Sequence, residues 1–240
     1  MLNLIKLEIK RNRLKGYITA GLLITFAVLG LVYLFAAIPH LDASDTDVQI
    51  FITYNGIATL SLVVATACFS ILSSAMYNRF IVEEYASKKV FLLFSYPVKR
   101  SRVLLAKVIT VFLFTFVSML FSGVITFTIF FTTEAFVPIC QEAITMSTLF
   151  GIAISLIAYS IIAAALAVIS LWFGYWKKSA SVTIIVGVIV SCVFGSFASE
   201  ILLAGEIFNS VIVLVIAAAS ILVAFVLTKA LSKKISTMEV

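Results

Sequence analysis

Every lysine and arginine of this chain falls on one side of a membrane if six long apolar stretches each cross it once. The seventeen basic residues form four clusters, at 6–15, 79–107, 177–178 and 229–234, and pairs of apolar stretches separate the clusters. The connection inside each pair holds acidic residues and no basic one. Because basic loops stay on the cytoplasmic side of a membrane, both termini and all basic segments are predicted to be cytoplasmic.

The chain is 63% hydrophobic and 12% charged, which is too little charge for the surface of a soluble domain of 240 residues. A membrane helix needs about 20 apolar residues to cross a hydrocarbon core about 30 Å thick. Six stretches are long enough, at 16–38, 49–77, 108–131, 146–175, 180–199 and 209–228. We therefore predict an all-α membrane protein, in which one six-helix transmembrane domain spans residues 1–240 in the plasma membrane of a bacterium.

The net charge of +6 does not predict nucleic-acid binding, because apolar spans separate the basic residues into different loops. Anionic head groups are the better counter-charge, so membrane lipids are expected as partners and nucleic acid is not. The apolar run from Gly16 to Ile38 is too long for the core of a signal peptide and predicts an uncleaved first span. The first fifteen residues, with Leu2, Ile5 and Ile9 on one side, predict a helix at the membrane surface.

None of the six spans holds Asp, Glu, Lys, Arg or His in its apolar core. Ion-coupled pumps place such residues there, so a self-powered transporter is not expected. The chain also lacks the G-x-x-x-x-G-K-[ST] run of a nucleotide-binding loop. Any uphill transport would therefore draw its energy from another polypeptide, and no cofactor is expected in this chain.

The inventory of reactive residues argues against an enzyme. His40 is the single histidine and falls in the first outer loop, so the sequence indicates neither a Ser–His relay nor a histidine-rich metal site. Glu83 and Glu84 are adjacent, so their side chains diverge on a helix and do not form a facing acid pair. No catalytic, cofactor-binding or metal-binding residue is predicted.

The second span carries a strip of polar residues on one helical face, because they recur at spacings of three, four and seven. The members of this strip are Asn55, Thr59, Thr66, Ser70 and Ser73. Side chains of this kind hydrogen-bond across helix interfaces in membranes, and they also suit a translocation path. Packing and path lining both stay open on the sequence.

The fifth span carries a stripe of small residues at every fourth position. The stripe consists of Thr183, Gly187, Ser191, Gly195 and Ser199. Small residues at this spacing let two helix backbones approach closely in lipid, where packing replaces the hydrophobic effect. The stripe predicts a tight helix contact, and the partner helix belongs either to this chain or to a second copy.

The longest segment between spans is a basic loop at 78–107. Residues 80–94 favour a helix, with Glu84 four positions before Lys88 in the better orientation for an ion pair. Pro97 disfavours a helical residue before it and is well placed to begin the next helix. The apolar residues in the middle of the loop would be hidden either by a partner protein or by the chain's own bundle.

The loop contains an acidic pair, a short polar gap, the run L-L-F-S-Y-P-V-K-R at 92–100 and an Ala–Lys pair at 106–107. These residues and the six-span layout resemble the type 2 ABC exporter permeases. Among these permeases, the loop and the layout are most similar to those of the small permeases of bacterial bacitracin, lantibiotic and related peptide export or self-immunity systems. Many relatives carry a Gly-Thr pair after the acidic residues, where this chain has Ser87 and Lys88.

The resemblance implies that the loop is a cytoplasmic coupling helix between spans two and three, which docks on a separate ABC ATPase. The residues expected to serve this coupling are Glu83, Glu84, Tyr85, Lys88, Phe91, Pro97 and Arg100. It also implies two copies of an ATPase that binds ATP and Mg, and a second permease subunit in a homodimer or heterodimer. The first and fifth spans, with the small-residue stripe, would lie near the dimer seam.

The expected function is that of a permease subunit of an ATP-driven exporter, moving a hydrophobic or amphipathic peptide or a lipid-like substrate out of the cell. Spans without buried charge suit such a substrate. The alternative is a non-transporting membrane scaffold or immunity protein that binds a peptide or a lipid. The segment 198–209 is expected either to dip back toward the membrane from outside or to form an extracellular turn.

Overall fold

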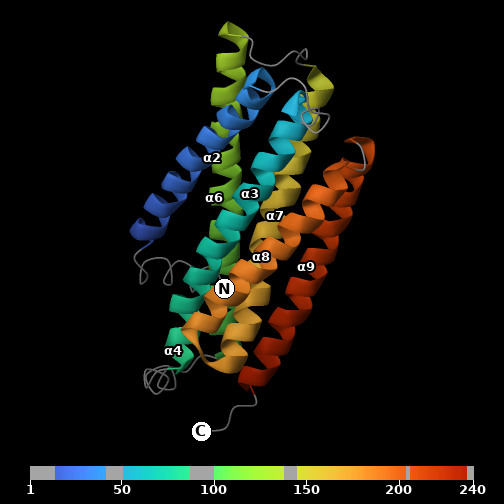
Figure 1. Ribbon diagram of the computed structural model, residues 1–240. Helices are drawn as coiled ribbons and strands as arrows, with labels where there is room; N and C mark the ends of the chain where they lie inside the picture. The colour runs from blue at the N-terminus through green and yellow to red at the C-terminus, as the bar shows by residue number, and fades with distance from the viewer. Residues whose placement is uncertain (1–13, 42–50, 87–99, 138–144, 204–205, 237–240) are drawn as a thin grey trace.

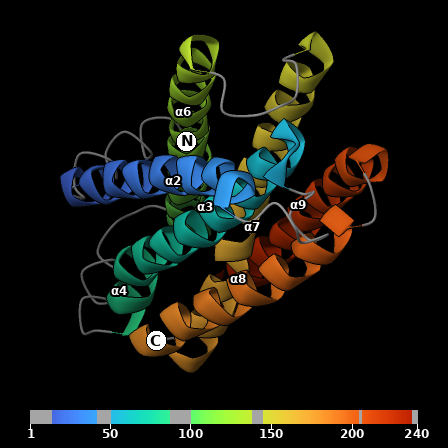
Figure 2. The ribbon, with the colours of Figure 1, turned by 45° about the horizontal axis from the view of Figure 1, so that its top comes forward.

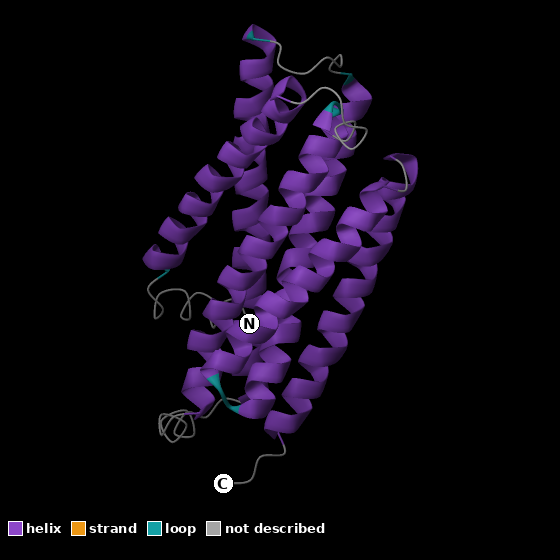
Figure 3. Cartoon of the chain, viewed as in Figure 1, coloured by secondary structure: helices purple, strands orange, loops and turns teal. Residues whose placement is uncertain are grey.

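The computed structural model describes residues 14–41, 51–86, 100–137, 145–203 and 206–236. Within these ranges the chain is almost entirely helical and contains no strand, so the all-α prediction is confirmed (Figure 3). The helices are α2 (Lys15–Leu41), α3 (Tyr54–Tyr77), the π-helix η2 (Asn78–Val82), α4 (Glu83–Ala86), α6 (Arg100–Phe136), α7 (Met146–Lys177), α8 (Ala180–Leu203) and α9 (Glu206–Ser236). The surface helix predicted for the first fifteen residues falls outside the described part except for its last two positions.

Six helices are long and apolar enough to cross a membrane, which confirms a multi-pass membrane protein. They are α2, α3 with its η2 extension, α6, α7, α8 and α9. The six pack as one bundle and alternate in direction (Figure 1). The end of the bundle at which α4 lies and α6 begins is called the basic end below, and it is at the bottom of Figure 1. The other end is called the opposite end.

Local contacts explain where several helices begin and end. Thr53 caps α3, because its hydroxyl accepts a hydrogen bond from the backbone N–H of Gly56 at 3.2 Å. Thr145 caps α7 in the same way, with the N–H of Thr148 at 3.4 Å. α7 is terminated by Lys178, whose φ of 49° is left-handed. Since α8 begins two residues later, α7 and α8 form a tight antiparallel hairpin.

α3 and α7 form the centre of the bundle (Figure 2). α7 contacts α3, α6, α8 and α9, while α3 contacts α2, α6, α7 and α8. In the most apolar stretch of α7, 67% of the residues are buried, whereas 17% are buried in that of α9. The outer helices expose large apolar side chains such as Phe26 and Phe197. Lipid tails are as apolar as these side chains, so such surfaces fit a membrane interior.

Most of the small-residue stripe of α8 packs against helices of the same chain. Thr183 is buried against Gly174 of α7, where an added methyl group would overlap the Thr183 hydroxyl oxygen. Gly187 lies against Ser74 of α3, where a methyl group would lie 2.6 Å from the hydroxyl oxygen. Ser191 is also buried. These three positions are occupied by contacts within the chain, so they do not provide a surface for the expected dimer seam.

The rest of the stripe is less enclosed. Gly195 is half-buried, and a methyl group added there would reach Val63 of α3 at 3.9 Å, which is ordinary contact. Ser199 is exposed, and its hydroxyl donates to the backbone carbonyl of Ser196. The close packing predicted from the stripe is therefore strongest toward the basic end of α8.

α6 differs most from its predicted span. It runs from Arg100 to Phe136, beyond the predicted 108–131 at both ends, and therefore includes Lys107 and Glu134. Glu134 was expected in an outer loop, yet it is only 5% exposed. The hydroxyl of Tyr54, at the start of α3, donates to the Glu134 carboxylate at 3.0 Å. This contact and the aromatic rings around it hold the last turns of α6 against α3.

Other helix ends also correct the predicted boundaries. α2 continues to Leu41, so His40 lies in its last turn and not in a loop, and the second span begins at Tyr54 and not at 49. α8 extends to Leu203 and α9 begins at Glu206. The segment 198–209 is therefore helical on both sides of residues 204–205, which lie outside the described part, and the choice between a turn and a segment that dips back stays open.

We expect Gly187→Ala to destabilise the bundle by about 1–3 kcal/mol, because the added methyl group would overlap Ser74 at the α3–α8 contact. Gly30→Ala is the matched control, since nothing lies within 4 Å of a methyl group at that position and alanine favours helix. Thermal unfolding of both variants in detergent measures the difference. If the two variants melt at the same temperature, the contact is looser than the structure shows.

Candidate functional site: a buried ion pair at the basic end

At the basic end, α3 continues without a break through η2 into α4 (Figure 1). The π-helix has the wider hydrogen-bond pattern of its class, because the backbone N–H of Glu83 donates to the carbonyl oxygen of Asn78. The continuous segment of η2 and α4, residues 78–86, is called the arm below. The next described helix begins at Arg100, so the predicted loop at 78–107 is helical at both of its ends.

Lys107 of α6 points into the protein and has a side-chain exposure of 0%. Its ammonium donates a hydrogen bond to the backbone carbonyl of Phe80 at 2.8 Å and forms an ion pair with the Glu84 carboxylate. A buried ammonium is costly unless it is paired and hydrogen-bonded. The two contacts supply a counter-charge and an acceptor, and both come from the arm.

An apolar cluster surrounds the Lys107 contacts. Its fully buried members include Met76, Ile81, Val82, Leu104 and Leu171. Tyr77 belongs to the same cluster, and its hydroxyl donates to the backbone carbonyl of Val108 at 3.2 Å. Water competes little in such surroundings, so these polar contacts hold the arm and α6 in a defined relative position.

The two adjacent acids of the arm face different environments, as expected for neighbouring positions on a helix. Glu84 contacts Lys107, whereas Glu83 is exposed and accepts a hydrogen bond from the side-chain amide of Asn78 at 3.2 Å. The predicted partner of Glu84 was Lys88, which lies outside the described residues. The observed partner is a cation that α6 brings in from 23 positions away, because α6 packs beside the arm.

The other predicted coupling residues are not placed by the structure. Tyr85 lies in α4 and Arg100 begins α6, but their side chains fall outside the described part of the molecule. Lys88, Phe91 and Pro97 lie wholly outside it. A role of these residues in coupling therefore stays a prediction.

The part played by Lys107 was not apparent from the sequence, where it only marked the entry to the third span. One local signal was present in the sequence, because the residues on either side, Ala106 and Val108, are apolar; the structure buries both. The two partners of Lys107, Phe80 and Glu84, could not be inferred from the sequence, since they depend on how α6 packs against the arm.

The polar strip of α3 lies mainly in helix interfaces. Its buried members, at most 5% exposed, are Thr59, Thr66, Ser70 and Ser73, while Asn55 is half-buried. The hydroxyl of Thr115 in α6 donates to that of Ser73 at 2.8 Å, and Ser70 is hydrogen-bonded to Ser191 of α8. These bonds between helices support the packing interpretation of the strip.

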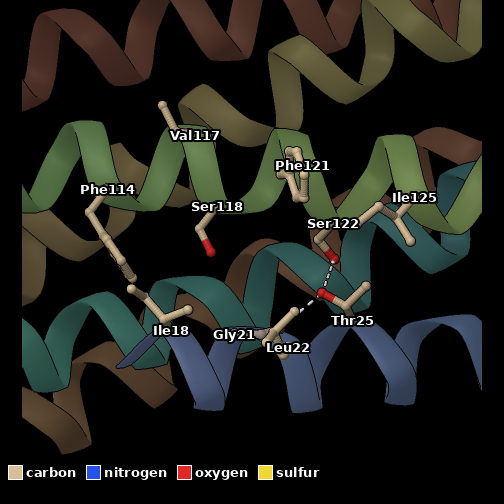
Figure 4. A pocket seen from close by; sticks show the side chains of 10 residues that line it. All are labelled: Ile18, Gly21, Leu22, Thr25, Phe114, Val117, Ser118, Phe121, Ser122 and Ile125. Carbon is tan, nitrogen blue, oxygen red and sulfur yellow. Dashed lines mark hydrogen bonds between the residues drawn. The ribbon is translucent and has the colours of Figure 1, made fainter. Parts of the chain in front are cut away.

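A groove of about 280 Å³ opens at the surface between α2 and α6 (Figure 4). Its walls are formed by Ile18, Gly21, Leu22, Thr25, Phe114, Val117, Ser118, Phe121, Ser122 and Ile125. The Thr25 hydroxyl donates to the Ser122 hydroxyl at 2.9 Å and links the two helices beside the groove. The walls are apolar apart from three hydroxyl groups, which is the chemistry that suits an acyl chain or an apolar side chain.

Comparison with known proteins gives two matches. The model of a family described as ABC-2 family transporter protein matches residues 4–195. The chain is also similar to a Bacillus subtilis (strain 168) protein named Uncharacterized protein YcbO, with 23% identity over 195 residues. That alignment covers 81% of this chain and 84% of YcbO. No solved structure matches the chain significantly.

We expect Glu84→Leu to destabilise the protein by about 3–5 kcal/mol, because it removes the carboxylate that is paired with the buried Lys107 ammonium. Lys107→Met should cost less, since the Glu84 side chain is 19% exposed and can be hydrated once its partner is gone. Glu83→Leu is the control on the exposed neighbour and should cost no more than about 1 kcal/mol, the worth of one hydrogen bond. Unfolding in detergent ranks the three variants. A Glu83→Leu variant as unstable as Glu84→Leu would contradict the assignment of the buried pair.

Proposed function

The chain belongs to the ABC-2 family of transporter proteins, and from that premise we propose that it is the permease subunit of an ATP-driven exporter. The family match covers the first four spans, the arm and most of α8. In this family the membrane protein is a transport component, and a separate ATPase hydrolyses ATP. The observation that carries the proposal is the family match, together with six helices able to cross a membrane.

In the proposed complex the basic end faces the cytoplasm, because basic segments are retained on that side, and both termini lie there at the plasma membrane. The ATPase then meets the permease at the basic end, where Glu83 is an exposed acid of the arm. ATP and Mg bind to the ATPase and not to this chain. Two ATPase copies and a second permease subunit, identical to this chain or related to it, complete the complex.

The proposed cargo is a hydrophobic or amphipathic peptide or a lipid-like molecule that moves outward. The middle of each described span holds no Asp, Glu, Lys, Arg or His, while Lys107 and Glu134 lie near the two ends of α6. A charged cargo would meet no counter-charge along such helices. The apolar groove between α2 and α6 offers surface of the kind that this cargo would contact.

Purification of the tagged full-length chain from its native membranes tests the proposal. We expect an ATPase with a nucleotide-binding P-loop to copurify, and the complex to hydrolyse ATP. Repeated purification without any such ATPase would overturn the proposal and would favour a non-transporting protein that binds a peptide or a lipid.

Charge reversal on the arm tests where the ATPase binds. Glu83→Lys should reduce recovery of the ATPase about tenfold, which corresponds to about 1.4 kcal/mol of binding free energy. Glu200→Lys makes the same charge change at an exposed acid near the opposite end and should leave recovery unchanged. Equal recovery with both variants would exclude Glu83 from the contact with the ATPase.

A further inference from the structure

The Lys107 contacts span the point at which helix α3 changes its hydrogen-bond pattern. Phe80 lies within the π-helix η2, and Glu84 lies just beyond it in α4. One ammonium therefore contacts both the π-helix and the turn that follows it. π-helical turns are rare and occur frequently at functional sites. Here the turn is held by a side chain from a different helix.

Three polar contacts join the arm and the preceding turn of α3 to two consecutive residues of α6. Tyr77 bonds to the carbonyl of Val108, while the carbonyl of Phe80 and the carboxylate of Glu84 both contact Lys107. Apolar contacts are non-directional and let helices slide, whereas hydrogen bonds set distance and angle. The buried cation thus fixes the arm to α6 more closely than the surrounding apolar cluster could alone.

Stability is a poor explanation for a charged pair at this place. Replacing a buried ion pair by well-packed apolar residues is often neutral or stabilising, because two charges have to be taken out of water. The stronger effect of such a pair is on geometry, since the partners hold only when the arm and α6 stand in one relative position. That effect matters where the position of one segment has to determine the position of another.

We propose that Lys107 is a positioning residue that makes the arm and α6 move as one body when the ATPase acts on the arm. This inference rests on the proposed function, in which an ATPase meets the permease at the basic end. α6 is 37 residues long and therefore about 55 Å from end to end. It carries one wall of the groove with α2 and ends beside Tyr54 at the opposite end. A displacement of the arm thus reaches the groove and the opposite end through one rigid helix.

Distances between spin labels in the purified complex with its ATPase test this proposal. Cys68, Cys140 and Cys192 are first replaced by alanine, so that labels attach only to introduced cysteines. One label pair, at Arg79 and Leu113, reports on the arm relative to α6, and both positions are exposed. A second pair, at Phe136 and Val211, reports on α6 relative to α9 near the opposite end, again at exposed positions. Each distance is measured without nucleotide and with ATP and vanadate.

In the otherwise unchanged chain, nucleotide should leave the Arg79–Leu113 distance constant and shift the Phe136–Val211 distance by about 1–5 Å, because helix movements in such transitions run from about 1–2 Å to one helical turn. Lys107→Met should reverse this result, so that the first distance changes and the shift of the second falls to less than about half. Lys107→Arg should keep much of the original behaviour, because it retains a cation that can pair with Glu84. Arg102→Met removes an exposed base from the same helix and should behave like the unchanged chain.

The outcomes separate this inference from the proposed function. If the ATPase copurifies and Lys107→Met shifts the second distance as fully as the unchanged chain, the positioning role is wrong and the permease assignment stands. The positioning role is also wrong, and the permease assignment stands, if the ATPase copurifies but nucleotide changes neither distance in the unchanged complex. If no ATPase copurifies, the proposed function fails and this inference fails with it. Where Lys107→Met does not yield folded protein, Glu84→Gln keeps the Phe80 contact and should show the same change at smaller amplitude.

Discussion

The hydrocarbon interior of a membrane offers no water to polar groups, and the rest of this structure follows from that constraint. Backbone groups are satisfied within helices, which is why every span is a helix. Many hydroxyl groups bond to a carbonyl of their own helix or to a hydroxyl of a neighbouring helix, as in the contacts of Thr115 with Val111 and Ser73. A hydroxyl that bonds across an interface, such as that of Thr115, therefore shows which helices are in contact.

The same constraint acts most strongly on charge. Lys107 and Glu134 lie near the two ends of α6, and each is buried with a partner from the α3 side of the bundle. Their partners differ in kind, because Lys107 meets a carboxylate and a backbone carbonyl, whereas Glu134 meets the hydroxyl of Tyr54. α6 is thus tied to the continuous α3–η2–α4 helix at both ends. The centre of α6 carries the groove with α2 between these two ties.

The packing of α8 bears on how two permease copies would meet. Thr183, Gly187 and Ser191 bring α8 against α7 and α3, so the close approach that small residues allow takes place within one chain. The outward face of α8 carries large apolar residues such as Ile185 and Phe197. A contact with a second copy through α8 would use that face, which resembles a lipid-facing surface.

The fold class, the number of spans and their alternating direction could be predicted from the sequence. Helix formation in a membrane depends on local length and apolarity, and loop charge is also a local property, so both can be read along the chain. It also predicted a tight contact for α8, because the small residues recur on one helical face.

Which helices meet could not be predicted from the sequence, because it depends on tertiary packing. The pairing of Glu84 with Lys107, the burial of Glu134 and the contact of Gly187 with Ser74 all join residues that are distant in sequence. The π-helical turn at 78–82 likewise has no clear sequence signal, because a change of one residue in helix register depends on what the side chains beyond it contact. Those contacts are set by the packing of α6 beside the arm, which no local pattern specifies.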